Sequence, residues 1–371
     1  MLNIRLNRKE FLKKIQIVDN AIVDDKANGI NSGIFIETQD DKLLLKAMGE
    51  GLYIKAEMPC EVIEKGEFII KHKLMEEFLK QLDQEIIEIK EINGKISIIS
   101  GKSSSEFSIY EYEKRNEPTI NNGLEFTFKR EELYEDLERV KFAASVNLDR
   151  LAVNSIRFEI DNTGIKLVSS DAHRLIFLNK EFAEKANLET LSISIPLRSV
   201  NSLTKIMKII EDETLTFKSE GTRILFKFND VEILTKLVEI QYPDYKTLLN
   251  SVRNNKKALL NTRDLISILK RVSVFVKDNN DKKDIAIFEF EDNQLEVLGS
   301  NDLAISKEKI NCIYEGENLR IALNVKYILD YLSTISESPV VEVKMFDERT
   351  PVLLNVENNK ESIYLVAPTQ I

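Results

Sequence analysis

The sequence predicts an α+β protein made of three similar domains, each with two helices packed on antiparallel strands. Three observations lead to this prediction: the length, a helical pattern that occurs three times, and alternating stretches between the helices. With 371 residues the chain is too long for one ordinary hydrophobic core and suits two or three domains. Hydrophobic residues at 43% and charged residues at 31% are typical of a soluble globular protein.

One amphipathic helical pattern recurs at wide spacing along the chain. It reads NRKEFLKKIQIV from Asn7, KREELYEDLERV from Lys129 and NTRDLISILKRV from Asn261. In each copy apolar residues fall at i, i+4 and i+7, which places them on one side of a helix. Asn7 and Asn261 each precede an acidic residue three positions later, the spacing of an N-cap and its third-position acid. We therefore expect three helices that each bury one apolar stripe.

A second helical pattern follows each of the first ones. It reads IKHKLMEEFLKQL from Ile70, IPLRSVNSLTKIM from Ile195 and LNVKYILDYLSTI from Leu323. Between the helices, GIFIETQDDKLLLKAM, SIRFEIDNTGIKLVSS and IAIFEFEDNQLEVLGS each contain two alternating runs around a polar turn, which is typical of a β-hairpin. Polar stretches precede each repeat, so the predicted domains span residues 1–122, 123–251 and 252–371.

Basic side chains gather on the predicted helices although the net charge is −10 at pH 7. Lys80 and Lys205 lie two positions past an apolar anchor, a rotation of about 200° that points them away from the buried stripe. The basic positions of interest are Lys13, Lys14, Lys73, Lys80, Arg198, Lys205 and Lys326. An ordinary solvated face is the alternative, because charge runs usually mean no more than that. The acidic first helix of the second domain and Ser333, in place of a lysine, favour this alternative.

The composition indicates a reduced, cytoplasmic location. Cys60 and Cys312 lie in strand-like stretches without nearby zinc ligands, so two reduced thiols are expected. No apolar run approaches the roughly 18 residues that cross a bilayer, and the first residues lack the order of a signal peptide. We expect no membrane partner.

Signals for catalysis are weak. Ser169, Ser170, Asp171 and His173 suggest a hydrolase or nucleotidyl transferase, but neighbours on one short stretch do not provide the geometry of a triad. Neither a GxxxxGK[ST] nor a GxGxxG phosphate-binding motif occurs. Acidic pairs could suggest a metal-dependent nuclease, yet each sits in a polar turn where carboxylates are commonest: Asp40 with Asp41, and Asp278 with Asp281. We expect no catalytic residue, no metal and no cofactor.

Four segments resemble the bacterial DNA sliding clamp family, and the resemblance covers the whole chain. They are SSDAHRL from Ser169, YPDYKTLL from Tyr242, IALNVKYILDYL from Ile321 and the terminal YLVAPTQI from Tyr364. In that family two protomers of three similar domains close head to tail into a ring, with helices inside and sheets outside. The resemblance implies the DNA clamp fold and a homodimeric, non-catalytic processivity factor, the β subunit of DNA polymerase III, in the bacterial cytoplasm at the nucleoid.

The resemblance also implies partners. The ring would encircle double-stranded DNA without reading its sequence, because side chains that meet phosphates carry no base information. It would tether the replicative DNA polymerase, be opened by the clamp loader, and bind other proteins with a clamp-binding motif. An interaction scaffold that never touches DNA is the third class considered, and the acidic composition suits it. Retention on circular DNA after loading separates a clamp from such a scaffold.

Partner peptides of the family insert hydrophobic anchors into a groove between the second and third domains. By position, the groove residues are Val153, Ser170, Ala172, His173, Arg174, Leu175, Pro243, Thr247, Leu248, Leu365, Ala367, Pro368, Thr369, Gln370 and Ile371. Ala172 replaces a usual Gly and Thr247 stands where many members have Arg. Smaller or different residues also replace the bulky terminal ones, so the rim is expected to differ in its peptide preference.

Further residues are carried over from the family by position. Phe107 and Ile109 match an apolar protomer edge, and Val274 with Phe275 match its partner on the third domain. Plain core packing is the alternative for these four, since alternating apolar residues are normally buried. Lys26 and Arg150 resemble residues that touch DNA.

Overall fold

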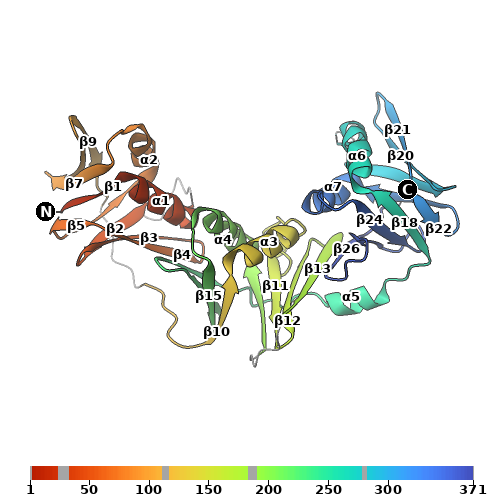
Figure 1. Cartoon of the computed structure of the whole chain (residues 1–371), viewed down its shortest axis with the longest axis horizontal. Coiled ribbons are helices and arrows are strands. Elements are labelled where there is room, and N and C mark those ends of the chain that lie inside the picture. The colour runs from red at the N-terminus through yellow and green to blue at the C-terminus, as the bar shows by residue number, and fades with distance from the viewer. Residues whose placement is uncertain (1, 24–32, 111–116, 183–189, 278–281, 371) are drawn as a thin grey trace. The chain divides into compact units, whose positions relative to one another are not determined.

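The computed structural model describes residues 2–23, 33–110, 117–182, 190–277 and 282–370. One order of elements occurs three times along the chain: a strand, a helix, a run of strands, a second helix and three strands (Figure 1). The predicted α+β class and threefold internal repeat are therefore confirmed. Among the described residues, no helix is long and apolar enough to cross a membrane.

The bounds of the elements follow the repeat. The first repeat contains β1 (Asn3–Asn7), α1 (Arg8–Val18), the 3-10 helix η1 (Asp19–Ala21), β2 (Ile34–Gln39), β3 (Lys42–Gly49), β4 (Leu52–Pro59), β5 (Glu61–Glu64), β6 (Glu67–Ile70), α2 (His72–Gln81), β7 (Ile86–Ile92), β8 (Lys95–Ser100) and β9 (Ser103–Ser108). The second contains β10 (Leu124–Lys129), α3 (Arg130–Lys141), β11 (Ser155–Ile160), β12 (Gly164–Ser170), β13 (Arg174–Glu181), β14 (Leu191–Pro196), α4 (Leu197–Ile209), β15 (Thr214–Glu220), β16 (Arg223–Lys227) and β17 (Val231–Lys236). After α5 (Tyr245–Ser251), the third contains β18 (Lys256–Asn261), α6 (Thr262–Val276), β19 (Ile285–Glu291), β20 (Gln294–Ser300), β21 (Ile305–Asn311), β22 (Ile313–Glu315), β23 (Leu319–Asn324), α7 (Val325–Thr334), β24 (Val340–Met345), β25 (Val352–Val356) and β26 (Ser362–Val366).

The first helix of each repeat forms for the reasons expected from its pattern. The side chain of Asn7 accepts a hydrogen bond from the backbone N–H of Glu10, and Asn261 does the same for Asp264. The nine apolar positions of the recurring pattern are all buried: Phe11, Ile15, Val18, Leu133, Leu137, Val140, Leu265, Leu269 and Val272. The predicted hairpins are the antiparallel pairs β2–β3, β11–β12 and β19–β20.

Contacts divide the chain into two compact units and split the central repeat between them. Unit 1 comprises Met1–Tyr134 and Arg198–Leu237, and unit 2 comprises Glu135–Leu197 and Val238–Ile371. The cause is strand pairing. In unit 1, β17 pairs with β4 in a sheet of order β10-β15-β16-β17-β4-β3-β2-β6. In unit 2, β13 pairs with β26 in a sheet of order β14-β11-β12-β13-β26-β25-β24-β18-β22.

Each unit also holds a smaller sheet. In unit 1 its order is β5-β1-β7-β8-β9, and in unit 2 it is β21-β20-β19-β23, so β9 and β21 are edge strands. The helices α1 and α2 pack on each other in unit 1, as α6 and α7 do in unit 2. The predicted domain borders near residues 122 and 251 stay a prediction, because the contacts follow the shared sheets instead.

Candidate functional site

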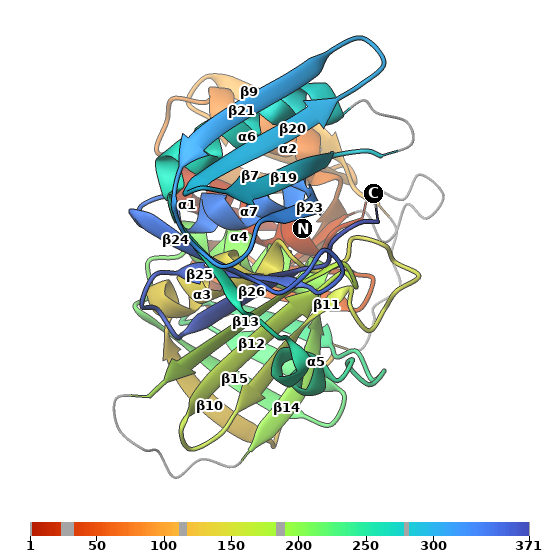
Figure 2. The same ribbon diagram turned by 90° about the vertical axis from the view of Figure 1, so that its right-hand side faces the viewer.

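The residues predicted to bind a partner peptide all belong to unit 2, and the ladder between β13 and β26 brings many of them together. In this ladder Leu175 lies opposite Leu365, and Arg174 lies opposite Val366. The two strands run side by side in the middle of the nine-stranded sheet (Figure 2). Segments almost 200 residues apart in the sequence therefore form one surface. Ile371 lies outside the described residues.

Beneath this surface lies an apolar cluster. Leu175 and Leu365 pack with Val168, Tyr242 and Tyr245, and all five are buried. Tyr245 opens α5, a helix whose N-cap, Asp244, accepts a hydrogen bond of 3.1 Å from the backbone N–H of Thr247. Burial raises the pKa of both tyrosine hydroxyls, so they stay neutral at pH 7. The cluster provides a firm apolar floor.

A rim of mostly exposed residues borders this floor. Val153 and Ser170 are buried beside it, and Ala367 and Pro368 are half-buried. The exposed members of the predicted set are Ala172, His173, Pro243, Thr247, Leu248, Thr369 and Gln370. An apolar floor with a polar rim is the common arrangement of sites that take up hydrophobic anchors.

The turn between β12 and β13 is held by its own side chains. The Ser170 hydroxyl donates a 2.7 Å hydrogen bond to the Arg174 carbonyl, and Asp171 Oδ1 accepts one of 2.9 Å from the His173 N–H. Ala172 at the tip has a φ of +78°, in the left-handed region that favours glycine. A Gly would adopt this backbone conformation without strain, whereas Ala172 holds it under strain.

The C-terminal segment is tied to two other parts of unit 2. The N–H of Ala367 donates a 2.8 Å hydrogen bond to the carbonyl of His173, which joins the segment to the turn. The N–H of Thr369 donates one of 2.9 Å to the carbonyl of Ala322 in β23. The terminus is therefore an ordered side of the surface over the residues that the structure describes.

Arg174, predicted as a groove residue, contacts the helix α7. Its guanidinium Nη1 donates to Asp330 Oδ2 at 2.6 Å, and the Tyr327 ring centroid lies 4.3 Å from the guanidinium carbon. Burial disfavours its charge, but Tyr364, Asp330 and Asp171 outweigh burial and raise the pKa of Arg174. Alternation along β13 turns this side chain away from that of Leu175, and the assignment of Arg174 to the groove stays a prediction.

The residues of the possible catalytic cluster do not form a triad. The hydroxyl of Ser169 is buried and donates to the carbonyl of Val140, while that of Ser170 donates to Arg174. The carboxylate of Asp171 binds the Arg174 side chain at 2.9 Å instead of orienting His173. Within the described ranges no group of three or more His, Cys, Asp or Glu residues could hold a metal ion. This geometry offers no activated nucleophile.

The predicted basic residues of unit 1 lie on α1, α2 and α4, and most of them pair with carboxylates. Lys13 lies 3.2 Å from Glu211, and Lys80 lies 2.7 Å from Glu76. Arg198 pairs with Glu50 in the same way. Lys73 and Lys205 are exposed on the same helices. Surface pairs of this kind hold their charges weakly, so the lysines can exchange partners.

The structure corrects the prediction for Lys14. It was expected on the exposed basic side of α1, but its side chain is buried and pairs with Asp230. The loop before β17 supplies this carboxylate, which neutralises the lysine ammonium. Lys26 lies outside the described residues, as do Asp278 and Asp281 of the second acidic pair.

In unit 2, Lys326 is exposed in the first turn of α7. Arg150 is exposed as well and donates a 3.2 Å hydrogen bond to the carbonyl of Asp171. It belongs to a loop after α3 that also presents Val146 and Leu148, 84% and 74% exposed. This apolar loop could not be recognised from the sequence, because a lone leucine among polar residues carries no periodic signal.

The predicted protomer-contact residues lie at or near the two edge strands. Phe107 is on β9, where it is buried against Phe78 of α2 at a centroid distance of 5.8 Å, and Ile109 just beyond β9 is half-buried. Val274, on α6, is 56% exposed, and Phe275 is half-buried. The alternative of core packing thus applies to Phe107, whereas Val274 is free to meet another molecule.

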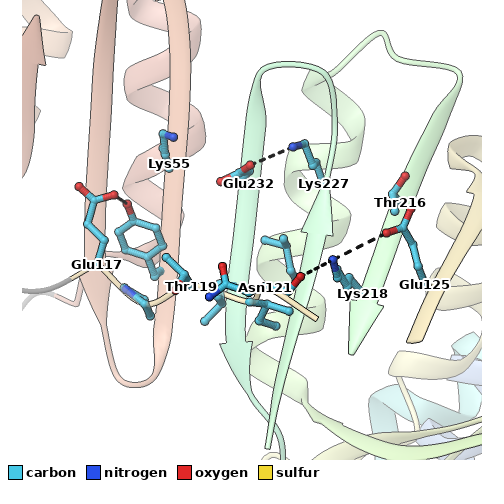
Figure 3. A pocket seen from close by; sticks show the side chains of 14 residues that line it. Lys55, Glu117, Thr119, Asn121, Glu125, Thr216, Lys218, Lys227 and Glu232 are labelled. Atoms are coloured by element: carbon cyan, nitrogen blue, oxygen red, sulfur yellow. Dashed lines mark hydrogen bonds and ion pairs between the residues drawn. The ribbon is translucent and has the colours of Figure 1, made fainter. Parts of the chain in front are cut away.

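A separate pocket of about 500 Å³ lies on unit 1 and contains none of the predicted residues (Figure 3). It lies where the segment 117–121 crosses β4, β17, β16 and β15. Its charged groups pair with one another: Lys227 lies 3.3 Å from Glu232, and the carboxylate of Glu117 accepts a 3.0 Å hydrogen bond from Tyr53. The bond between Tyr53 and Glu117, with one of 3.1 Å that Lys218 donates to the carbonyl of Asn121, ties the segment to the sheet.

Sequence reasoning assigned no role to four residues that the structure places at or near the predicted groove residues: Tyr242, Tyr245, Tyr327 and Asp330. All four lie within the motifs YPDYKTLL and IALNVKYILDYL. Aromatic residues repeated within a short motif were the available signal. Their roles depend on contacts across unit 2, which no local pattern reveals.

Comparison with known proteins places this geometry in a family. Models of the N-terminal, central and C-terminal domains of the DNA polymerase III beta subunit match residues 2–120, 127–244 and 252–370. A beta sliding clamp of Chlamydia muridarum is 24% identical over 99% of this chain and 98% of its own length. One of Rickettsia bellii is also 24% identical, over the whole of both chains.

Solved structures agree in fold. The crystal structure of the DNA polymerase III beta subunit of Thermotoga maritima matches over the full length of both chains, with a TM-score of 0.93 and 24% identity. The beta chain of Streptococcus pneumoniae matches equally far, with a TM-score of 0.93 and 20% identity. Sequence has diverged while the arrangement of elements has not.

Proposed function

Since the chain belongs to the DNA polymerase III beta subunit family and serves as a sliding clamp, the processivity subunit of that polymerase, we propose how it does so. Two copies form a closed ring around duplex DNA, and partner proteins dock on the surface of unit 2. The ring performs no catalysis of its own and works in the bacterial cytoplasm at the nucleoid. The observation that carries the proposal is the series of three matching domains on one repeated order of elements.

We assign the DNA contact to basic side chains that reach the surface, most of them on helices. Those of unit 1 are Lys13, Lys73, Lys80, Arg198 and Lys205, and those of unit 2 are Arg150 and Lys326. Several are paired with nearby carboxylates, so each contact with a phosphate is weak and screened by salt. Weak, sequence-blind contacts suit a ring that must slide, since closure and not affinity keeps it on DNA.

The peptide surface around Leu175 and Leu365 supplies the partner site in this proposal. Its apolar floor fits the hydrophobic anchors of a short peptide, and the exposed rim sets which flanking residues are accepted. Replicative polymerase, clamp loader and other proteins with a clamp-binding motif would compete for it. Thr247, Thr369 and Gln370 make this rim less basic and less bulky than is usual in the family, so its peptide preference should differ.

Ring closure is assigned to the edge strands. β9 and β21 each pair on one side only, which leaves backbone groups available to a second copy. Phe107 and Ile109 belong to the first edge, and Val274 with Phe275 lie on the helix that packs on β20 and β21. Head-to-tail pairing of β9 of one copy with β21 of the other closes a ring of two chains and leaves neither of these two edges free. In this ring the domains span 1–122, 123–251 and 252–371.

Loading on DNA tests the proposal as a whole. The chain, labelled with a fluorophore, is incubated with a nicked circular duplex, ATP and a bacterial clamp loader, and bound protein is separated by gel filtration. We expect retention in moderate salt that disappears when a restriction enzyme linearises the circle, because a ring slides off a free end. If linearisation does not change retention, the chain binds DNA without encircling it and the proposal is wrong. If the chain is not retained at all, the interaction scaffold that never touches DNA is the better explanation.

A further inference from the structure

The Arg174 side chain carries an inference that rests on the proposed peptide binding and deepens it. In the β13–β26 ladder, successive side chains alternate between the two faces of the sheet, so Arg174 lies on the face away from the floor formed by Leu175 and Leu365. We propose that Arg174 is a positioning residue: it holds α7 against the turn of residues 170–174 and fixes the peptide surface without touching the peptide.

Every side of the guanidinium is already occupied. Nε donates to Asp171 Oδ2 at 2.9 Å, Nη1 to Asp330 Oδ2 at 2.6 Å, and Nη2 to the carbonyl of Phe142 at 2.8 Å. Hydrogen bonds between ions are roughly twice as strong as neutral ones. With its side chain 10% exposed, Arg174 would have to break one of these bonds to reach a peptide on the opposite face.

Two aromatic rings complete the site. The guanidinium carbon lies 4.3 Å from the ring centroid of Tyr327 and 5.5 Å from that of Phe142. The Tyr327 carbonyl in turn accepts a 2.9 Å hydrogen bond from the hydroxyl of Tyr364, which stacks on Tyr331. A planar cation can bind carboxylates at its edge and rings on its faces at once, whereas a lysine ammonium cannot. The site is built for arginine.

The contacts form a closed circuit of three segments. The turn is joined to the C-terminal segment by the bond between His173 and Ala367, and that segment is joined to β23 by the bond between Thr369 and Ala322. β23 runs directly into α7 through the N-cap Asn324. The bond from Arg174 to α7 is the third side. Without the bond between Arg174 and Asp330, α7 and β23 can shift relative to the turn. Residues 367–369, which are bonded to β23, would move with them.

Conservative variants test this role. Asp330→Asn keeps the shape of the residue on α7 that accepts from Arg174 and removes its charge. Arg174→Lys keeps the positive charge and loses the planar, forked set of N–H donors. Glu337→Gln, an exposed carboxylate just after α7, is the matched control. The probe is a fluorescein-labelled hexapeptide with two leucines and a phenylalanine, titrated by anisotropy. We expect both variants to weaken binding at least about tenfold, the size of effect seen when a charged hydrogen bond is lost.

The outcome that overturns the inference is specific. If Arg174 bound the peptide directly, Arg174→Lys would weaken binding of the probe, whereas Asp330→Asn would not. If it positions α7, the double variant that combines Arg174→Lys with Asp330→Asn should lose no more affinity than the worse of these two single variants, because the two residues act through one bond. Additive losses would contradict a shared role.

A readout without peptide keeps this inference separate from the proposed function. Hydrogen exchange of the Ala367 and Thr369 amides should become faster in Asp330→Asn than in wild type or Glu337→Gln, since both amides bond within the circuit. Unchanged exchange at both amides overturns the positioning role. If the probe fails to bind wild type, the proposed peptide site fails, while the exchange result still decides what Arg174 does.

Discussion

The peptide surface of unit 2 and the basic helix face of unit 1 hold their charges in opposite ways. Behind the peptide surface, Arg174 has a side chain that is 10% exposed and donates to three acceptors. On the basic face, the side chain of Lys80 is 46% exposed and pairs with Glu76. Water screens the second kind of pair and leaves the first nearly unscreened. The region around Arg174 therefore holds its side chains in a fixed geometry. The basic helix face of unit 1 presents charged side chains that can move.

This difference fits two tasks that one ring must combine. A partner peptide has to be recognised by shape, which requires an ordered floor and a rim that does not move. DNA has to pass through without being held at any one position, which requires contacts that form and break easily. Mutations can separate the two regions, and those with the largest expected effects come first.

Removing residues 367–371 should abolish binding of the leucine- and phenylalanine-containing hexapeptide, a loss of about 100-fold or more, because one whole side of the surface disappears. Anisotropy titration measures this loss. Sedimentation and retention on nicked circles should remain as in wild type, since the basic helices and the edge strands are untouched. Unchanged peptide affinity would place the partner site elsewhere.

Val274→Asp should convert the ring into monomers. A carboxylate at an apolar protomer contact would be buried without a partner, which costs several kcal/mol. Sedimentation velocity at micromolar concentration measures the mass, and retention on DNA should vanish while hexapeptide affinity stays at the wild-type value. Because Val274 is exposed, the urea unfolding midpoint of the Val274→Asp variant should equal that of wild type.

Two further variants make this test independent of folding. Phe107→Ala with Ile109→Ala should also give monomers, but with a lower urea midpoint, since a buried Phe→Ala change costs about 3–5 kcal/mol. Arg263→Asp, at the other end of α6, introduces the same acid and should leave the dimer intact. A persistent dimer in Val274→Asp would remove that helix from the contact.

Glu76→Gln should strengthen DNA attachment by releasing Lys80. Burial opposes the charge of Glu76, but hydrogen bonds from Lys80 and Gln16 outweigh it and lower its pKa below the ordinary 4.5. The carboxylate is therefore ionised, and its pair present, at pH 5 as well as pH 7; the pair and its contribution to stability are lost only as pH falls through the lowered pKa. The salt dependence of DNA binding should steepen by about 0.9 in logarithmic slope, the value for one additional phosphate neutralised by Lys80.

The matched control for this change is Glu77→Gln. It removes an equal charge from the same helix and leaves the Lys80 pair intact, so it should change the slope less. Filter binding of a linear duplex at several salt concentrations measures both variants. Equal effects of the two variants would mean that net charge, and not the release of Lys80, governs attachment.

Ala172→Gly should stabilise the turn by about 1 kcal/mol, because the cost of a left-handed φ on an L-residue disappears. Urea unfolding of the full chain, followed by tyrosine fluorescence, measures the midpoint. Ala152→Gly nearby is the control, and it should not stabilise. A lower midpoint for Ala172→Gly would show that the side chain contributes more than the strain removes.

The sequence was sufficient for the threefold repeat, and the peptide surface that it indicated stays a prediction. It could not give the direction of a side chain that depends on a distant partner. The stripe of Phe11, Ile15 and Val18 could be read from local periodicity alone. Lys14 was assigned to the basic face although it lies three positions after Phe11, close to the apolar stripe, and the carboxylate of Asp230 that pairs with it lies 216 residues further along the chain. The contacts of Arg174 with α7 likewise exist only in the folded chain.

The division of the central repeat has a consequence for how the chain can be taken apart. A fragment cut at residue 251 would separate β13 from β26, and one cut at residue 122 would separate β17 from β4. Each cut leaves long bare strand margins that readily recruit other chains, which leads to swapped or aggregated assemblies. Although the three repeats share one order of elements, strand pairing between them prevents a simple truncation from yielding an independent repeat.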